Sequence, residues 1–278
     1  MDQYQLQTPR TAHGFMPVST LTNCFLLGTC FLMVTVAAYA QVAPGPITSS
    51  GLNTQISAPI NIPGGKVQYD ITGGTRPGNG LNLFHSFGEF GVPTNNIANF
   101  LNNSGLATSN ILGRVTGGNP SNMFGTIQTT GFGSSNLFLM NPAGFLFGPT
   151  ATLNAGGMVT FTSADYLKLT DGVRFNAIPN AVADALLTAA PVAAFGFLGS
   201  NPGAISIQGS QLTVAYGQGI SLVGGDITIG GATLAPKTVQ PALLSAPGGQ
   251  INLVSGVCDA KRDNLGRYDR CERSPHCR

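Results

Sequence analysis

Short runs of alternating apolar and polar residues recur along most of the chain. In the C-terminal half most runs are four or five residues long, and glycine-containing corners separate most of them; the runs span residues 204–208, 211–215, 219–223, 226–229, 232–234 and 250–254. Alternation at period two predicts β-strands. Strands this short suit a parallel β-helix, in which each strand pairs with the strand one coil earlier and the inward side chains share one core. Such a stack needs capped ends, because exposed strand edges invite aggregation.

Residues 136–157 show the same pattern around an Asn-Pro-Ala-Gly tetrapeptide at 141–144. Pro142 cannot donate a backbone hydrogen bond, and Gly144 is suited to a positive φ, so we expect a tight turn there. Two further corners follow within the segment. Strand, turn, strand, turn and strand then occupy about twenty residues, which is close to the length of one solenoid coil.

Alternation also predicts strands nearer the N-terminus, at residues 66–72, 81–92, 110–116, 123–129 and 158–163. In the second of these, Leu81, Leu83, His85 and Phe87 fall on one face. No Ser-His-Asp or Cys-His signature accompanies His85. A packed structural histidine is therefore the favoured interpretation over a catalytic one.

Residues 180–190 form the one convincing helix candidate. Alanine and leucine dominate this segment, Asn180 could cap it, and Pro191 ends it. The alternative is a loop excursion between coils.

The first forty residues resemble an export signal rather than part of the fold. Arg10 and His13 precede an apolar run at 24–40 that ends in Ala-Tyr-Ala before Gln41. This pattern predicts a secretory signal peptide at 1–40, cleaved after Ala40. A single transmembrane anchor is the alternative, although the run is short for a spanning helix.

Charge is scarce in the chain and balanced in its body. Charged residues make up 9% of the sequence, against roughly 25% in an average soluble domain. Residues 41–256 hold six basic and six acidic side chains. A neutral body lacks the basic footprint that nucleic-acid binding needs, so no nucleic-acid partner is expected.

Catalytic and metal chemistry find little support in this composition. Some β-helix proteins are polysaccharide lyases or hydrolases, which need clustered carboxylates. Asp165 and Asp171 are the closest acidic pair, and a solvated loop is the favoured interpretation for them. A β-helix lyase or hydrolase stays as the alternative function, and no cofactor or metal is expected. An outer-membrane β-barrel is a further alternative, but its strands are about ten residues long.

Residues 257–278 differ sharply from the body. They carry six basic and four acidic side chains, together with Cys258, Cys271 and Cys277. With His276 these thiols could form a zinc set by residue type, but they lack the usual close pairing. The abrupt change of composition favours a truncated or out-of-frame tail, and the role of the cysteines stays open.

Four segments of the chain resemble a known family in their order and spacing. They are N-L-F-H-S-F, N-I-L-G-R-V-T-G-G-N-P-S, N-L-F-L-M-N-P-A-G-F-L-F-G and G-G-D-I-T-I, which begin at residues 82, 110, 136 and 224. Residues 41–256 thereby resemble the two-partner secretion domain of filamentous haemagglutinin-type exoproteins. The family usually has Asn-Pro-Asn-Gly at the turn, so Ala143 is a departure that removes one polar side chain.

The resemblance implies an all-β fold, a right-handed parallel β-helix with an N-terminal cap and extra-helical hairpins. It implies export by the Sec machinery, recognition by the POTRA domains of an outer-membrane β-barrel transporter, folding at the cell surface and service as an adhesin module. By matching position, Asn110, Arg114, Asn141, Pro142 and Gly144 are the candidates for partner recognition or folding. For the last three, the alternative is that they only shape a turn.

Overall fold

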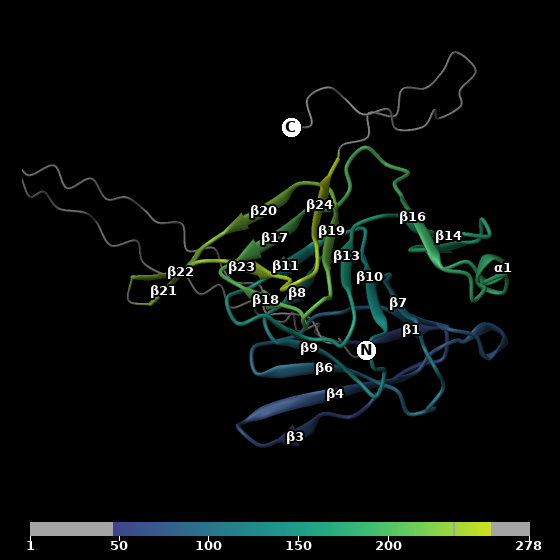
Figure 1. The fold of residues 1–278 in the computed structure, drawn as a ribbon, viewed down its shortest axis with the longest axis horizontal. Coiled ribbons are helices and arrows are strands. Elements are labelled where there is room, and N and C mark those ends of the chain that lie inside the picture. Colours follow the sequence, from purple (N-terminus) through teal and green to yellow (C-terminus); the bar gives the residue numbers. More distant parts are fainter. Residues whose placement is uncertain (1–46, 236, 257–278) are drawn as a thin grey trace, which may run out of the picture. The chain divides into compact units, whose positions relative to one another are not determined.

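The computed structural model describes residues 47–235 and 237–256 (Figure 1). Regular structure in these residues is almost entirely β-strand, apart from the one-turn helix α1 (Ala181–Asp184) and the 3-10 turn at Pro77–Asn79. Within the same residues, no helix has the length and apolar character needed to cross a membrane. The expected signal peptide at 1–40 and the tail at 257–278 lie outside the described residues.

Three sheets of parallel strands make up the body. Sheet A consists of β5 (Asn82–Phe87), β7 (Asn110–Val115), β10 (Asn136–Met140), β13 (Val159–Thr162), β19 (Ile220–Gly224) and β24 (Ile251–Ser255). Sheet B consists of β4 (Lys66–Gly73), β6 (Asn96–Leu101), β9 (Thr126–Thr130) and β12 (Thr152–Asn154). Sheet C consists of β8 (Ser121–Met123), β11 (Phe145–Phe147), β17 (Ile205–Gln208) and β20 (Ile227–Gly230).

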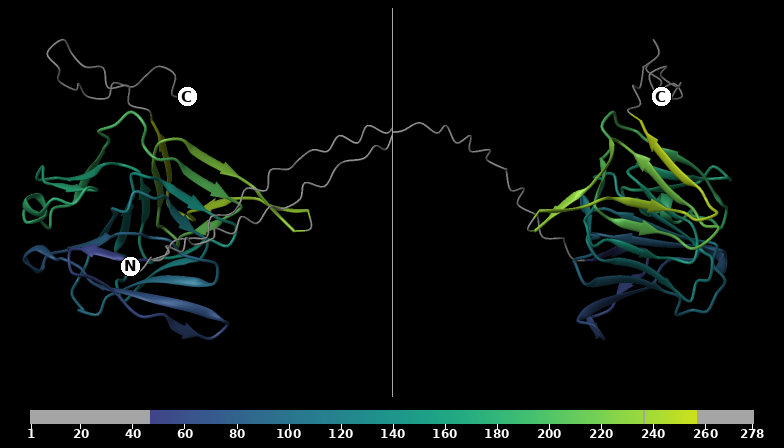
Figure 2. Two further views of the ribbon diagram at one scale, coloured as in Figure 1. Left: turned by 180° about the vertical axis from the view of Figure 1, so that it is seen from behind. Right: turned by 60° about the vertical axis from the view of Figure 1, so that its left-hand side comes forward.

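The chain visits these sheets in a repeating order. From β7 in sheet A it passes to β8 in sheet C and β9 in sheet B, and β10, β11 and β12 then repeat the circuit. Each return is parallel and in register, so Leu137 of β10 lies opposite both Ile111 of β7 and Val159 of β13. Figure 2 shows the sequence colours advancing from one end of this stack to the other. The expected parallel pairing of short strands is confirmed.

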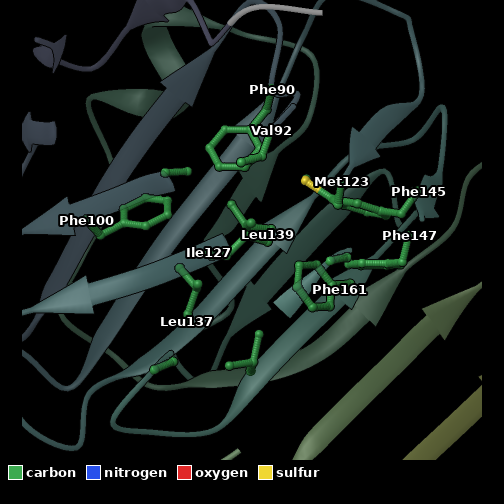
Figure 3. Packing of buried hydrophobic residues seen from close by; sticks show 14 of the residues in the cluster. Phe90, Val92, Phe100, Met123, Ile127, Leu137, Leu139, Phe145, Phe147 and Phe161 are labelled. Carbon is green, nitrogen blue, oxygen red and sulfur yellow. The ribbon is translucent and has the colours of Figure 1, made fainter. Parts of the chain in front are cut away.

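The inward-facing residues of the three sheets form one continuous core (Figure 3). Phenylalanines contribute much of it: the rings of Phe147 and Phe161 meet edge to face with centroids 4.7 Å apart. Burying each such side chain stabilises the fold by about 1.5–3 kcal/mol. The core is therefore the main source of stability for strands too short to persist alone.

Antiparallel strands close the N-terminal end of the stack. Strand β1 (Ser49–Gly51) pairs with β5 of sheet A, whereas β2 (Thr54–Ile56) and β3 (Ile60–Ile62) pair with β4 of sheet B. Toward the other end, β18 (Gln211–Thr213) pairs in parallel with β23 (Leu243–Ser245), and β21 (Ala232–Leu234) pairs in antiparallel with β22 (Thr238–Gln240). The β21–β22 pair projects from the body (Figure 2).

An antiparallel sheet interrupts the stack between β13 and β17. It consists of β14 (Tyr166–Leu169), β15 (Arg174–Asn176) and β16 (Val192–Gly196), with α1 in the connection from β15 to β16. We call residues 166–196 the excursion. It covers the outer face of sheet A and forms a second buried cluster there, in which the rings of Phe84 and Phe175 lie 5.0 Å apart. Strands β5, β7 and β10 are consequently buried on both faces.

Several predicted boundaries are wrong. The strand expected at 81–92 is only β5, because the chain bends after Phe87, and Leu81 lies outside the strand with 48% of its surface exposed. The strand expected at 123–129 is divided between β8 and β9. At the corner between them, a side chain on Gly125 would lie 2.2 Å from the carbonyl oxygen of Asn96. Close approach between coils therefore sets this corner.

The predicted helix at 180–190 is also too long. It extends only over α1, although Asn180 caps it as expected by accepting a hydrogen bond from the backbone N–H of Ala183 at 3.0 Å. Four residues are too few for an isolated helix, and none of them is buried, so the helix depends on its cap and on polar contacts with the rest of the fold.

Candidate functional site

The tetrapeptide at 141–144 forms the tight turn that connects β10 to β11. The carbonyl oxygen of Asn141 accepts a hydrogen bond from the N–H of Gly144 at 2.9 Å, and its Oδ1 accepts one from the N–H of Ala143 at 3.0 Å. This double closure is typical of an Asn-Pro turn. Ala143 is not among the described residues with positive φ. Alanine at position 143 therefore fits the backbone of this turn, although the family that the sequence resembles usually has asparagine there.

The Asn141 side chain also fastens the turn to the preceding coil. Its Nδ2 donates to the carbonyl oxygen of Asn119 and to Oγ of Ser121, both at 2.9 Å, and only 1% of its surface is exposed. Both polar ends of the amide are thus occupied inside the protein. Asn141 can influence a partner only by positioning its neighbours.

Gly144 and Pro142 connect the turn to the following coil. Gly144 has a φ of +96°, and a side chain there would lie 2.2 Å from the carbonyl oxygen of Ala204. The carbonyl oxygen of Pro142 accepts a hydrogen bond from the N–H of Gly203 at 3.0 Å. The turn is therefore held between two neighbouring segments, while the Pro142 and Ala143 side chains stay half-buried at the surface.

Asn110 lies in a ladder of asparagines that crosses sheet A. Its Nδ2 donates to Oδ1 of Asn82 at 2.9 Å, and its Oδ1 accepts from Nδ2 of Asn136 at 3.2 Å. At the end of the ladder, Nδ2 of Asn82 donates to the carbonyl oxygens of Thr188 and Ala190. The ladder thus links three coils to the excursion.

Arg114 is the largest fully buried side chain of the described residues. Its guanidinium forms a bidentate ion pair with Asp184 of α1, at 2.8 Å to Oδ1 and 2.7 Å to Oδ2. It also donates to Oγ of Ser86 and to the carbonyl oxygen of Asn176, and it lies 5.2 Å from the centre of the Phe175 ring. Charge-assisted, bidentate pairs of this kind fix geometry strongly. Arg114 therefore clamps the excursion onto β7.

A small pocket of about 180 Å³ lies between the turn and the excursion. One wall is the end of β7 with the loop after it, including Val115 and Thr116; the second is residues 141–143, and the third is residues 177–179. We call it the turn pocket. Asn141 and Pro142 line it directly, and Arg114 holds the third wall through Asn176. Asn110 and Gly144 lie outside its lining, so the structure brings only part of the predicted set together.

His85 is packed in the core beside the N-terminal strands. It is 1% exposed, its Nδ1 lies 3.3 Å from Oγ1 of Thr54, and its ring meets those of Phe87 and Phe100. Burial, with a smaller contribution from the positive charge of Arg76, lowers the pKa of His85 to about 3. These contacts fit the expected structural role.

The low pKa of His85 predicts a pH-dependent stability. Between the ordinary pKa of 6.5 and the folded pKa of about 3, the unfolded chain binds a proton that the folded chain does not. The free energy of unfolding is expected to fall by up to about 1.4 kcal/mol per pH unit as the pH drops below 6.5. Urea unfolding of the wild type and of His85→Gln measures this effect. The variant should lose the slope between about pH 6.5 and 4.5; equal slopes would contradict the assignment.

The two candidate carboxylates bind local groups in the excursion or next to it. Asp171 accepts hydrogen bonds from Thr188 Oγ1 and the N–H of Val173, and these contacts lower its pKa. Asp165 accepts from the N–H of Leu198. In the described part of the chain, no three His, Cys, Asp or Glu side chains are grouped as metal ligands would be. Each carboxylate thus has a local structural partner.

The described residues thus form a stack of parallel strands with a clamped excursion and a turn that carries the Asn-Pro-Ala-Gly motif. The chain belongs to the family of TPS (two-partner secretion) secretion domains, whose family model matches residues 45–258, more than three quarters of the sequence. A search of curated proteins found no match to the chain. The match of the family model confirms the resemblance that the sequence motifs indicated.

Membership of this family defines the general role of the chain. It is a secretion domain of the two-partner type, which is exported to the cell surface or the extracellular space with a cognate outer-membrane transporter as its partner. The family is a secretion and adhesion module of haemagglutinin-type exoproteins and is not known as an enzyme family.

Proposed function

We propose that residues 41–256 form a right-handed parallel β-helix whose turn pocket is the docking point for the POTRA domains of the transporter. The observation that supports this most is the exposure of Ile178 beside the family motif. Ile178 lines the pocket, yet 81% of its surface is exposed. Single exposed apolar side chains are common on protein surfaces, so the support comes from the place of Ile178 in the pocket wall that faces residues 141–143 of the family motif.

The predicted site residues then divide into three roles. Pro142 lies at the surface and can contact the transporter. Arg114 and Asn141 are buried, so they hold the walls of the pocket in place. Asn110 and Gly144 act at a greater distance, through the asparagine ladder and the fit between coils. Recognition and folding are therefore coupled in this proposal, because losing a buried residue also displaces the contact surface.

The rest of the proposal concerns the route of export. Residues 1–40 act as a signal peptide that delivers the chain through the Sec machinery to the periplasm. The transporter then conducts it outward, and the first coils nucleate folding of the β-helix at the cell surface. There the domain serves as an adhesin module.

Replacing Ile178 with aspartate tests recognition separately from folding. The side chain has few internal contacts to lose, so the thermal midpoint should stay close to that of the wild type. A charge in the apolar contact should lower the amount of exported protein by about tenfold, which corresponds to on the order of 1.4 kcal/mol of docking energy. Export is measured in cells that produce the chain together with its transporter.

Val182→Asp is the matched control. Val182 lies four residues further along the excursion, in α1, is 76% exposed and does not line the pocket. It should export at the wild-type level. Wild-type export of Ile178→Asp would contradict docking at the turn pocket and would favour the alternative that residues 141–144 only shape a turn.

A further inference from the structure

The side chains that line the turn pocket have little capacity to bind a polar group. Among the described residues, the lining includes no charged side chain and only two polar ones, Thr116 and Asn141. The Thr116 hydroxyl donates its hydrogen to the carbonyl oxygen of Phe87 at 3.0 Å. Nδ2 of Asn141 donates to Asn119 and to Ser121. These two side chains therefore keep no hydrogen to donate to a partner.

Backbone donors around the pocket are largely occupied as well. The N–H of Ala143 donates to Oδ1 of Asn141 at 3.0 Å. The N–H of Ala177, in the third wall, donates to the carbonyl oxygen of Asp165 at 2.8 Å. The two prolines of the lining, at positions 142 and 179, have no N–H. A carboxylate or carbonyl group that entered the pocket would find few donors, and a cation would find no carboxylate in the described lining.

The size of the pocket suits a single apolar side chain. Its volume is about 180 Å³, which is close to that of cavities that bind one benzene-sized group. A leucine, methionine or phenylalanine side chain is of this size. Such a group needs no hydrogen bond, so it loses nothing on leaving water for this lining.

Two apolar residues bring the walls of the pocket to the surface. Ala143 of the turn is half-buried, and Ile178 of the excursion is 81% exposed. They belong to different walls. A group that enters between the turn and the excursion therefore meets both, and a polar side chain at either position would change the chemistry of the pocket.

We propose that the turn pocket receives one apolar side chain of the transporter, and that Ala143 and Ile178 are specificity-determining residues for it. This inference rests on the proposed docking at the turn pocket and adds the chemistry of the group that docks. A polar group on either side of the contact would be left without a hydrogen-bond partner. The walls thus select against transporters with a polar or charged group at that place.

Ile178→Asn tests the apolar contact in cells that produce the chain together with its transporter. Asparagine is uncharged, so it removes an apolar group without adding charge repulsion. Exported protein should fall by about tenfold, because the amide stays unpaired against an apolar partner. Val182→Asn is the matched control and should export at the wild-type level, since Val182 is 76% exposed and lies outside the lining.

Ala143→Asn tests the second wall. The φ of Ala143 is not positive, and only its backbone bonds to Asn141, so the thermal midpoint should stay close to that of the wild type. Export should again fall by about tenfold. Asparagine is usual in the family at this position, so the loss would mark a preference of this chain's own transporter. Ala215→Asn, at an exposed corner outside the lining, is the matched control.

The outcomes distinguish this inference from the docking proposal itself. If Ile178→Asp lowers export but Ile178→Asn exports at the wild-type level, docking at the pocket stands and the apolar side chain is overturned. If Ile178→Asp exports normally, both proposals fail. Wild-type export of Ala143→Asn would remove Ala143 from the specificity-determining residues, and equal losses in the control variants would overturn the inference. Where Ala143→Asn also lowers the thermal midpoint, Ile178→Asn decides.

Discussion

Asp184→Ala is expected to lower the free energy of unfolding by about 3–5 kcal/mol, the penalty typical of leaving a buried charge without its partner. Arg114 is almost fully buried, and two of its hydrogen bonds go to this carboxylate. Removing the Asp184 side chain leaves the buried guanidinium of Arg114 without its ionic partner. Urea unfolding followed by circular dichroism measures the loss, and amide hydrogen exchange should show the excursion opening before the coils.

The double variant Arg114→Met, Asp184→Ala separates the charge from the packing. Because the unpaired charge is then gone, it should be more stable than Asp184→Ala alone. A loss of less than about 1 kcal/mol in Asp184→Ala would show that the ion pair is not what holds the excursion.

Gly144→Ala is expected to destabilise the protein by about 3 kcal/mol or more, because a backbone clash adds to an unfavourable φ. The added carbon would lie 2.2 Å from the carbonyl oxygen of Ala204 in the following coil, so the two coils must separate locally. Chemical denaturation measures the change, and export should fall with it since the turn pocket adjoins the turn.

Gly118→Ala is the matched control for this prediction. Gly118 also has a positive φ, +79°, but nothing lies within 4 Å of the position a side chain would take. Gly118→Ala should lower the free energy of unfolding by only about 1–2 kcal/mol, because alanine disfavours the left-handed conformation. Equal losses in the two variants would show that close packing between coils contributes nothing at Gly144.

Alternation and turn residues predicted much of the parallel stack from the sequence. The runs at 110–116, 219–223 and 250–254 correspond to β7, β19 and β24, because inward and outward positions differ in polarity there. The turn at 141–144 was predictable because proline and glycine limit the backbone directly. Alternation within each run was sufficient to predict these strands, although β7 and β19 are buried along their whole length.

The excursion could not be predicted in the same way. Strands β5, β7 and β10 are buried on both faces, so the polarity of their sequence does not show that a second layer covers them. Strand β6 was also not predicted from the sequence. Asparagines rather than glycines border it, so its ends were not recognised as corners. The length of an element such as α1 depends on contacts between segments that are far apart in the sequence, such as the ion pair of Asp184 with Arg114.

The candidate site was predicted only in part for the same reason. Family resemblance identified Arg114, but no local pattern connects it to Asp184, which lies 70 residues further along the chain. Asn82 has a comparable role through carbonyl groups more than a hundred residues away. Partners at such distances become visible only when the coils are stacked.

Those distances along the chain also set an order of events during folding. Side-chain hydrogen bonds between neighbouring coils, such as those of Asn110 and Asn141, join residues 20–28 apart, whereas Arg114 and Asn82 reach the excursion across 62–108 residues. Nearby contacts form sooner than distant ones. In a chain that emerges N-terminus first, β5, β7 and β10 can stack before the excursion exists to cover their outer faces. For that interval Phe84, Leu112 and Phe138 face water, and self-association competes with completion of the fold.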